Sequence, residues 1–367
     1  MTATPEGATP NRVVPRRASV TTPGRDANIG GHMVPSVSVI LPARNAAATL
    51  ASALDSVRNQ SLSDLEIIVI DDGSTDATAS IAGQVAREDS RVVPLTCGSG
   101  LVDALNLGVA VARAPYVARM DADDACLPER FRLQKEHLDA HPDIGLVACA
   151  VAFGGDAMAA RGYAMHVEWT NRLLDHDAIS QNRFVESPLA HPSVMFRREL
   201  PARHGGYRSG PFPEDYELWL RWLEAGVRMA KLPEALLVWR DGPDRLSRRD
   251  ARYARDRFFQ IKAGYLARWL KEHNPHHPEI ITWGAGRLAR RRAEMLECHG
   301  IQITHQVDIS PRLVGRNAGG RPVIRPTDIP RDAFVVVFVG TRGARELIRA
   351  RLESDGRIMG RDFVLAA

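Results

Sequence analysis

Three aspartates crowd into four positions of this chain, directly after the apolar run 116–118. Carboxylates this close repel one another, so a folded chain keeps Asp121, Asp123 and Asp124 together when a cation lies among them. An Asp-x-Asp pair at the end of a strand suits a divalent cation, because its oxygen ligands leave coordination positions open for phosphate oxygens. The alternative is a solvated acidic loop that caps a helix starting near Pro128, and for Asp124 we favour that capping role.

Polar residues also follow two other β-branched runs, at 42–45 and at 71–76. Since the carboxyl ends of parallel strands meet at one edge of a sheet, we expect Asp72 to lie beside the aspartate cluster. The alternative for the turn 71–76 is purely structural, with Ser74 or Asp76 capping the next helix. Both interpretations hold together if Asp72 binds a ligand and Asp76 is structural.

A third acidic pair, Glu214-Asp215, opens an amphipathic pattern that continues to Leu223. The N-terminus of a helix is positive and keeps a carboxylate ionised, which suits a group that must accept a proton. The alternative is an ordinary acid at a helix start. Trp219 and Trp222 lie three residues apart on one face of this helix, and we expect both in the core.

The elements that must position these residues alternate between strand and helix. Strands are predicted at 37–42, 65–70, 91–95, 116–118 and 144–151, with helices at about 50–57, before Glu88, at 101–112 and at 129–141. This spacing indicates a parallel sheet covered by helices, with ligands bound at the carboxyl ends of its strands. Residues 156–182 show no clear pattern and are assigned no chemistry.

A length of 367 residues suggests about two domains. The 44% hydrophobic and 25% charged fractions are typical of a globular protein, and no apolar run approaches the roughly 18 residues of a membrane span. The four cysteines form no CxxC pair and are expected to be reduced, mostly buried thiols. Residues 1–34 lack apolar periodicity and are predicted to form a disordered basic tail.

The stretch 37–150 resembles the nucleotide-binding half of family 2 glycosyltransferases. The matching motifs are VSVILPARN at 37–45, DDGSTD at 71–76, ALNLG at 104–108 and ARMDADD at 118–124. The resemblance continues through 186–196 and 213–221 and fades near Ser247. It implies an α/β fold: a GT-A domain with a Rossmann-like mixed sheet, the nucleotide-diphospho-sugar transferase type, over about residues 35–250.

In such an enzyme a divalent cation, Mn²⁺ or Mg²⁺, assists departure of the nucleotide diphosphate. The resemblance implies that Asp123 binds this metal directly and that Asp121 is a second ligand or contacts the ribose. It implies that Asp72 accepts from the imide N–H of a uracil base, which favours a UDP-sugar donor. Arg119 either holds a phosphate or pairs with its acidic neighbours. The expected base pocket is lined by Pro42, Arg44 and Asn45.

An acceptor hydroxyl needs a general base before it becomes a good nucleophile. The resemblance implies Asp215 in this role, with Glu214 beside it, and a side-chain base with in-line displacement implies inversion at the anomeric carbon. His191 is expected on the side of the acceptor, a glycan or a lipid-linked sugar.

One departure from the family concerns the segment after the catalytic helix, where many relatives carry a metal-binding histidine. The segment 239–247 has none, so either Asp241 or Asp244 is expected to replace it as a ligand, or Arg240 and Arg245 are expected to bind the diphosphate directly.

Residues 251–278 are predicted to form an amphipathic helix and a linker. The helix either packs on the catalytic domain or lies on an anionic membrane surface. From residue 279 a strand, a glycine turn and a helix resemble a dinucleotide-binding fingerprint, in which Gly284, Gly286 and Asp308 would contact the nucleotide. We therefore expect a small Rossmann-like accessory domain at 279–367, either binding a nucleotide or purely structural.

The leading hypothesis is a cytoplasmic inverting glycosyltransferase of cell-surface polysaccharide synthesis, with peripheral association at the inner face of the plasma membrane left open and no nucleic-acid partner. Alternatives are a sugar-phosphate nucleotidyltransferase, disfavoured because residues 42–45 lack a glycine-rich basic loop, and a non-catalytic sugar-nucleotide-binding scaffold. An NAD-dependent oxidoreductase built on Gly284 and Gly286 is the least favoured, because no residues for hydride transfer are apparent.

Overall fold

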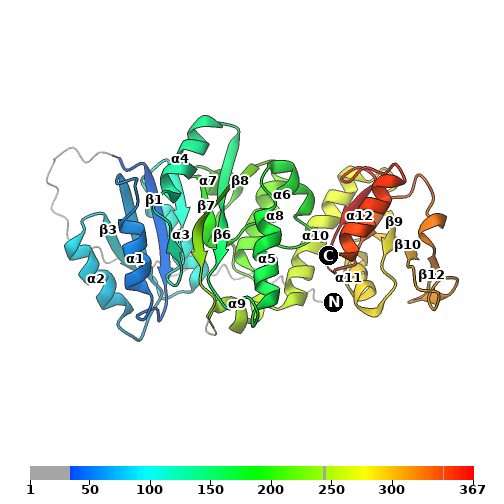
Figure 1. The fold of residues 1–367 in the computed structure, drawn as a ribbon, viewed down its shortest axis with the longest axis horizontal. Coiled ribbons are helices and arrows are strands. Elements are labelled where there is room, and N and C mark those ends of the chain that lie inside the picture. The colour runs from blue at the N-terminus through cyan, green and yellow to red at the C-terminus, as the bar shows by residue number, and fades with distance from the viewer. Residues whose placement is uncertain (1–33, 243–244, 342) are drawn as a thin grey trace, which may run out of the picture.

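The computed structural model describes residues 34–242, 245–341 and 343–367, so residues 1–33 of the predicted basic tail lie outside the described part. Two α/β units follow one another along the longest axis of the molecule (Figure 1). The first contains an eight-stranded sheet and the second a six-stranded sheet. The long helix α10 (Arg255–His273) lies between the two units.

The first sheet is built from β1 Val37–Ala43, β2 Leu65–Asp71, β3 Val92–Thr96, β4 Tyr116–Arg119, β5 Ala125–Cys126, β6 Ile144–Phe153, β7 Val194–Arg197 and β8 Arg228–Trp239. Its order is β3-β2-β1-β4-β7-β6-β8-β5. The first four strands of this order are parallel, whereas β7 runs antiparallel to both β4 and β6. The predicted mixed α/β sheet is confirmed, and the carboxyl ends of β1, β2 and β4 meet at one edge.

Helices cover both faces of this sheet, and strand β1 shows why. Alternate residues of a strand point to opposite faces, and Val39 packs with helices α1, α2 and α4, whereas Ile40 packs with α3 and α8. Trp219 and Trp222 on α8 are fully buried, as predicted. The helices of this unit are α1 Leu50–Arg58, α2 Thr78–Glu88, α3 Leu101–Val111, α4 Arg130–Ala140, α5 Arg161–Asn171, α6 His176–Asn182, α7 Leu200–His204, α8 Glu214–Glu224 and α9 Leu246–Arg249.

Residues 156–182, which show no pattern in the sequence, contain the two helices α5 and α6. Helix α5 buries only Val167 and Thr170, so its apolar face is too short to produce a clear periodic signal. Helix α6 begins with an Asp175 cap, whose carboxylate accepts from the Ala178 N–H at 2.8 Å.

The second sheet has the order β11-β12-β10-β9-β13-β14, with parallel pairing from β12 through β14. This arrangement confirms the predicted Rossmann-like α/β unit. Its elements are β9 Glu279–Trp283, α11 Arg287–Glu297, β10 Gln302–Val307, β11 Asn317–Ala318, β12 Arg321–Ile324, β13 Val335–Val337, α12 Ala344–Ser354 and β14 Phe363–Leu365.

Helix α10 packs on α8 of the first unit and on α11 of the second. One hydrophobic cluster joins Tyr216 and Leu220 of α8, Leu266 of α10 and Leu296 of α11. The predicted packing of α10 on the first unit is therefore confirmed. Within the described residues, no helix is long and apolar enough to cross a membrane.

Candidate active site

Asp72 lies directly after β2, in the turn that faces the end of β1. Its N–H donates to the Ala43 carbonyl, and its Oδ1 accepts from the Gly100 N–H at 2.8 Å. The residue is 5% exposed, and its Oδ2 lies 3.8 Å from Nη1 of Arg44, whose side chain is largely exposed. One carboxylate oxygen is thus fixed by backbone, and the other lies beside the exposed side chain of Arg44. Pro42 lies within buried strand β1, next to Ala43.

Asn45 has a structural role in the loop after β1. Its φ is +49°, and its Oδ1 accepts from the Thr75 N–H at 2.9 Å. In return the Asn45 N–H donates to the Ser74 hydroxyl at 2.9 Å. Asp76 accepts from the Thr78 N–H at the start of α2, and these hydrogen bonds from Thr78 lower the pKa of its carboxyl. This turn is therefore structural and locks the loops after β1 and β2 together, but the N-cap of α2 is Ala77 and not Ser74 or Asp76 as we expected.

The three aspartates of the acidic cluster converge after β4. One oxygen of each of Asp121, Asp123 and Asp124 lies within 4.8 Å of the others. Asp124 is fully buried and accepts from the Arg240 N–H at 2.9 Å. The predicted helix-capping role of Asp124 is wrong, because α4 has Glu129 at its N-cap and no side-chain cap. Asp124 instead ties the cluster to the segment after β8.

Two arginines supply positive charge to this cluster. Arg119, which is 4% exposed, contacts the carboxylate of Asp121. Arg245 lies 3.7 Å from Asp121 Oδ2 and 3.4 Å from Asp124 Oδ1, with its guanidinium 4.5 Å above the ring of Trp239. Burial and the charge of Asp121 nevertheless raise the pKa of Asp123 and, more strongly, that of Asp124. The arginines thus balance the cluster only in part.

The donor set of this cluster fits a hard divalent cation. It consists of carboxylate oxygens alone, and Asp124 Oδ2 is buried without a hydrogen-bond partner among the described residues. An orphaned buried carboxylate oxygen is costly unless a cation or a donor reaches it. Asp121 and Asp123 remain partly exposed, so the cluster is accessible to an ion from one side.

Glu214 and Asp215 begin helix α8, as predicted, but their environments differ. Glu214 is 1% exposed, and both its carboxylate oxygens accept from the Tyr253 hydroxyl, at 2.6 and 2.8 Å. Arg252 lies 3.7 Å from the same carboxylate. Asp215 is less buried, and burial together with the neighbouring charge of Glu214 raises its pKa to about 7. Asp215 is therefore poised to exchange a proton near neutral pH.

His191 is buried in the 3₁₀ turn before β7, and its Nε2 lies 2.9 Å from the Tyr207 hydroxyl. Burial and the charge of Arg119 lower the pKa of His191 well below its usual range, so the ring is neutral. Tyr207 is held in place by Asn106, which accepts from its N–H at 3.0 Å and donates to its carbonyl at 3.0 Å.

Arg119 joins the acidic cluster to this second group of residues. Its guanidinium contacts Asp121, and its charge partly opposes the rise in pKa that burial causes at Asp215 and Tyr207. The Nε of Arg119 is buried without a hydrogen-bond partner among the described residues. The carboxylate pair of α8 and the acidic cluster after β4 therefore share one electrostatic centre.

Arg240 and Asp241 lie at the border of the site and face different partners. The Arg240 guanidinium donates to the Ser52 hydroxyl at 3.2 Å, and only its backbone N–H reaches the acidic cluster. Both oxygens of Asp241 accept from Arg248, at 2.7 and 2.6 Å. Asp244, the other expected replacement for the missing histidine, lies outside the described residues. Arg245, expected to bind the diphosphate, has its side chain beside the aspartates.

The glycine turn of the second unit has the expected backbone shape. Gly284 has a φ of +120°, and a Cβ there would lie 2.8 Å from Cβ of Ala289. Gly286 precedes helix α11. Asp308 Oδ2 accepts from the Ala285 N–H at 3.0 Å, and its Oδ1 accepts from the Ser310 N–H at 2.9 Å. The carboxylate thus holds the turn in shape, and its availability for a nucleotide stays a prediction.

Sequence reasoning missed two residues of the first site, Tyr207 and Tyr253. Tyr207 follows two glycines in a loop without periodicity, and Tyr253 lies in a 3₁₀ turn nearly forty residues after its partner Glu214. A hydrogen bond between such distant loops leaves no local signal in a single sequence.

Comparisons with known proteins agree with this arrangement. A family model described as glycosyl transferase family 2 matches residues 38–203. The amylovoran biosynthesis glycosyltransferase AmsE of Erwinia amylovora is 33% identical over 217 residues, which cover 58% of this chain and 79% of that protein. The O-antigen biosynthesis glycosyltransferase WbnJ of Escherichia coli is 31% identical over 214 residues, which cover 56% of this chain and 79% of that protein.

Among solved structures, S. aureus TarS in complex with UDP-GlcNAc has a TM-score of 0.48 and 17% identity, over 64% of this chain and 73% of that one. The identity and coverage of the curated relatives, together with the mixed sheet, confirm the predicted GT-A fold and enzyme class. The chain belongs to glycosyl transferase family 2.

Proposed function

We propose that this family 2 glycosyltransferase transfers a sugar from a UDP-sugar to an acceptor hydroxyl with inversion at the anomeric carbon. Relatives named for amylovoran and O-antigen biosynthesis support a role in polysaccharide assembly. The acceptor is then a growing glycan or a lipid-linked sugar, met at the cytoplasmic side of the membrane. The observation that carries the proposal is the single electrostatic centre formed by Arg119, Asp121 and Asp215.

Asp72 recognises the donor base in this proposal. Its Oδ1 is already bound to the Gly100 N–H, which leaves Oδ2 to accept from the imide N–H of uracil. Arg44 Nη1 lies 3.8 Å from the same oxygen and flanks the base in this proposal. Guanine also offers an N–H donor to a carboxylate, so the comparison of UDP with GDP binding tests the choice of a UDP-sugar as donor. Pro42 and the locked Asn45 loop form the wall of the base pocket.

Asp121 and Asp123 would hold Mn²⁺ or Mg²⁺, with Asp124 as a further ligand from the buried side. The bound ion would neutralise charge that develops on the diphosphate as it leaves. Arg245 and Arg119 lie close enough to the aspartates to contribute positive charge to the same phosphates. Arg245 thus takes the place that a histidine holds in many relatives.

Asp215 acts as the general base and removes the proton of the acceptor hydroxyl as that oxygen attacks the anomeric carbon. Its pKa of about 7 matches proton transfer near neutral pH. Glu214 is bonded to Tyr253 through both oxygens, so it supports the reaction by raising the pKa of Asp215. The neutral His191 and the Tyr207 hydroxyl offer hydrogen bonds to the acceptor sugar.

Turnover of a panel of UDP-sugars with Mn²⁺, in wild type and Asp215→Asn, tests the proposal. An enzyme with this mechanism releases UDP and loses that turnover in the variant, while the variant still binds UDP. A non-catalytic sugar-nucleotide-binding scaffold would show equal, background UDP release in both proteins. Analysis of the anomeric configuration of the product then decides between inversion and retention.

A further inference from the structure

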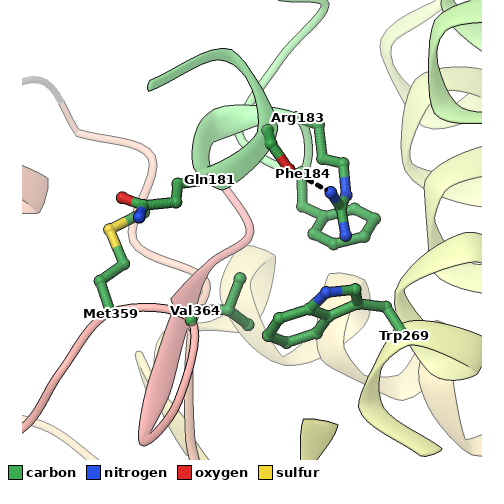
Figure 2. Close-up of a pocket in the computed structure, with 8 residues that line it drawn as sticks. Gln181, Arg183, Phe184, Trp269, Met359 and Val364 are labelled. Atoms are coloured by element: carbon green, nitrogen blue, oxygen red, sulfur yellow. Dashed lines mark hydrogen bonds between the residues drawn. The ribbon is translucent and has the colours of Figure 1, made fainter. Parts of the chain in front are cut away.

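A small cavity lies at the junction of the two units, far in the chain from the aspartates of the active site. Its volume is about 50 Å³, and Figure 2 shows the side chains around it. It is formed by the end of α6, by α10 and by the turn and strand near the end of the second unit. The lining residues are Ser180, Gln181, Arg183, Phe184, Trp269, Met359, Gly360 and Val364.

Arg183 is the one charged side chain in this lining, and it is 9% exposed. Its Nη1 donates to the Ser180 hydroxyl at 2.5 Å, and within the described residues it forms no ion pair with a carboxylate. The guanidinium lies 4.8 Å from the ring centre of Phe184 and 5.8 Å from that of Trp269 (Figure 2). The N–H groups of Nε and Nη2 remain as donors beside the cavity.

Two more buried cations lie at the same junction. Lys262 of α10 is 3% exposed and donates to the carbonyls of Phe184 and Val185, at 2.8 and 3.0 Å. Arg292 of α11 is 8% exposed, with its guanidinium 4.1 Å from the ring centre of Phe259. Within the described residues neither cation is paired with a carboxylate. The nearby Glu186 is exposed and lies 3.3 Å from His166.

Buried positive charge is unfavourable in a protein interior, because each cation loses its hydration, and at Arg183 the charges of Glu224 and Glu272 offset this loss only in part. Burial accordingly lowers the pKa values of Arg183, to about 10, and of Lys262 and Arg292. Cation–π contacts with Phe184 and Phe259 offset part of this loss. Within the described residues the one hydrogen bond of the Arg183 guanidinium goes from Nη1 to the Ser180 hydroxyl, so Nε and Nη2 are available to a ligand.

We infer that the cavity binds a small anion, a phosphate or a carboxylate group, held by Arg183 and the Ser180 hydroxyl. The planar guanidinium fork suits two oxygens of such a group, and the amide of Gln181 offers a further donor. About 50 Å³ admits a group of a few heavy atoms and excludes a whole nucleotide. Because α6 and the 359–364 segment both line the cavity, the anion bridges the two units.

Calorimetric titration of the full chain with inorganic phosphate and, separately, with acetate tests this inference. EDTA is present throughout, so that phosphate is not recruited by a metal ion at the acidic cluster. We expect saturable binding to the wild type, and a loss of about ten- to one-hundred-fold in affinity in Arg183→Met, because charge-assisted hydrogen bonds disappear. Tighter binding of phosphate than of acetate assigns a phosphate ligand, and the reverse order assigns a carboxylate.

Arg87→Met, an exposed arginine on α2 in the first unit, is the matched control and must bind as the wild type does. Ser180→Ala keeps the buried guanidinium, so it tests the site even if Arg183→Met fails to fold, and it should bind several-fold more weakly. No saturable binding of either anion, or equal binding by wild type, Arg183→Met and Ser180→Ala, would overturn the inference. Binding of UDP with Mn²⁺ to Arg183→Met should be unchanged, which keeps this result separate from the donor site.

Discussion

The environment of Asp215 predicts how the rate depends on pH. The carboxyl must be ionised to accept a proton, and its pKa is raised to about 7 by burial and by the charge of Glu214. One pH unit below that value only about a tenth of the molecules carry the ionised form. We therefore expect kcat/KM to rise through pH 7 and to fall about ten-fold for each unit below it.

Replacing Glu214 separates the two causes of this raised pKa. Glu214→Gln removes the neighbouring negative charge while keeping the shape of the side chain and an acceptor for Tyr253. Burial remains, so the pKa of Asp215 should fall part of the way towards 3.8. The acid limb of the profile then moves to lower pH, and activity at pH 6 rises relative to activity at pH 8.

UDP release from the best UDP-sugar, measured from pH 5.5 to 8.5 at saturating Mn²⁺, provides the assay. Glu224→Gln is the matched control, because it lies at the other end of α8 and pairs with Arg268. Its profile should overlay that of the wild type. Asp215→Asn should lose about 10²–10⁴-fold in kcat at every pH, which is the usual contribution of a general base. The proposed role of Asp215 would be refuted if the acid limb of the Glu214→Gln profile stayed at the wild-type pH, or if Asp215→Asn had a near-normal kcat.

Four further substitutions test the metal site, the base pocket, the Glu214 environment and the core. Arg245→Gln removes a cation that lies 3.4–3.7 Å from the aspartates, so Mn²⁺ should bind about ten-fold more tightly without nucleotide. Electron paramagnetic resonance measures this affinity, and an unchanged value would contradict the role of Arg245 as a positive charge within the acidic cluster. Asp72→Asn should lower the affinity of the protein for UDP and reduce the ratio of its UDP affinity to its GDP affinity, both measured by calorimetry. Tyr253→Phe should reduce the free energy of unfolding by about 1–3 kcal/mol, because the buried Glu214 loses a donor. Trp222→Ala, which empties a fully buried position, should cost about 3–5 kcal/mol in denaturant unfolding.

Much of the first unit follows from local patterns in the sequence. Strands β1, β2 and β4 are β-branched or apolar runs that end in polar residues, so their positions and the shared edge are predictable. Helix α8 combines an acidic start with a strong apolar face, and its role in the core is equally visible. Elements with weak apolar faces, such as α5, are not.

The contacts that complete the site are less predictable, because they join segments far apart in the chain. Asp124 has the local appearance of a helix cap, yet its partner is the backbone N–H of Arg240, 116 residues later. Tyr253 reaches Glu214 across 39 residues, and His191 meets Tyr207 across 16. Such pairs depend on how strands and loops are stacked in three dimensions rather than on any local propensity.

In the second unit and in α10, the sequence likewise does not predict the partners of charged residues. A glycine turn and an acid at Asp308 are visible in the sequence, but the hydrogen bond from the Ala285 N–H to that acid is not. Likewise Lys262 belongs to an amphipathic helix that would place a lysine in water. Packing of α10 between two units buries that lysine against backbone carbonyls instead.

Calorimetric titration of UDP, with Mn²⁺ and then with EDTA, tests the central claim most directly. We expect that UDP binds with Mn²⁺, that this binding weakens strongly in EDTA, and that Asp123→Ala loses the dependence on Mn²⁺. GDP should bind more weakly than UDP under the same conditions. Equal binding of UDP with and without Mn²⁺, in both wild type and Asp123→Ala, would contradict the proposed metal-assisted donor site.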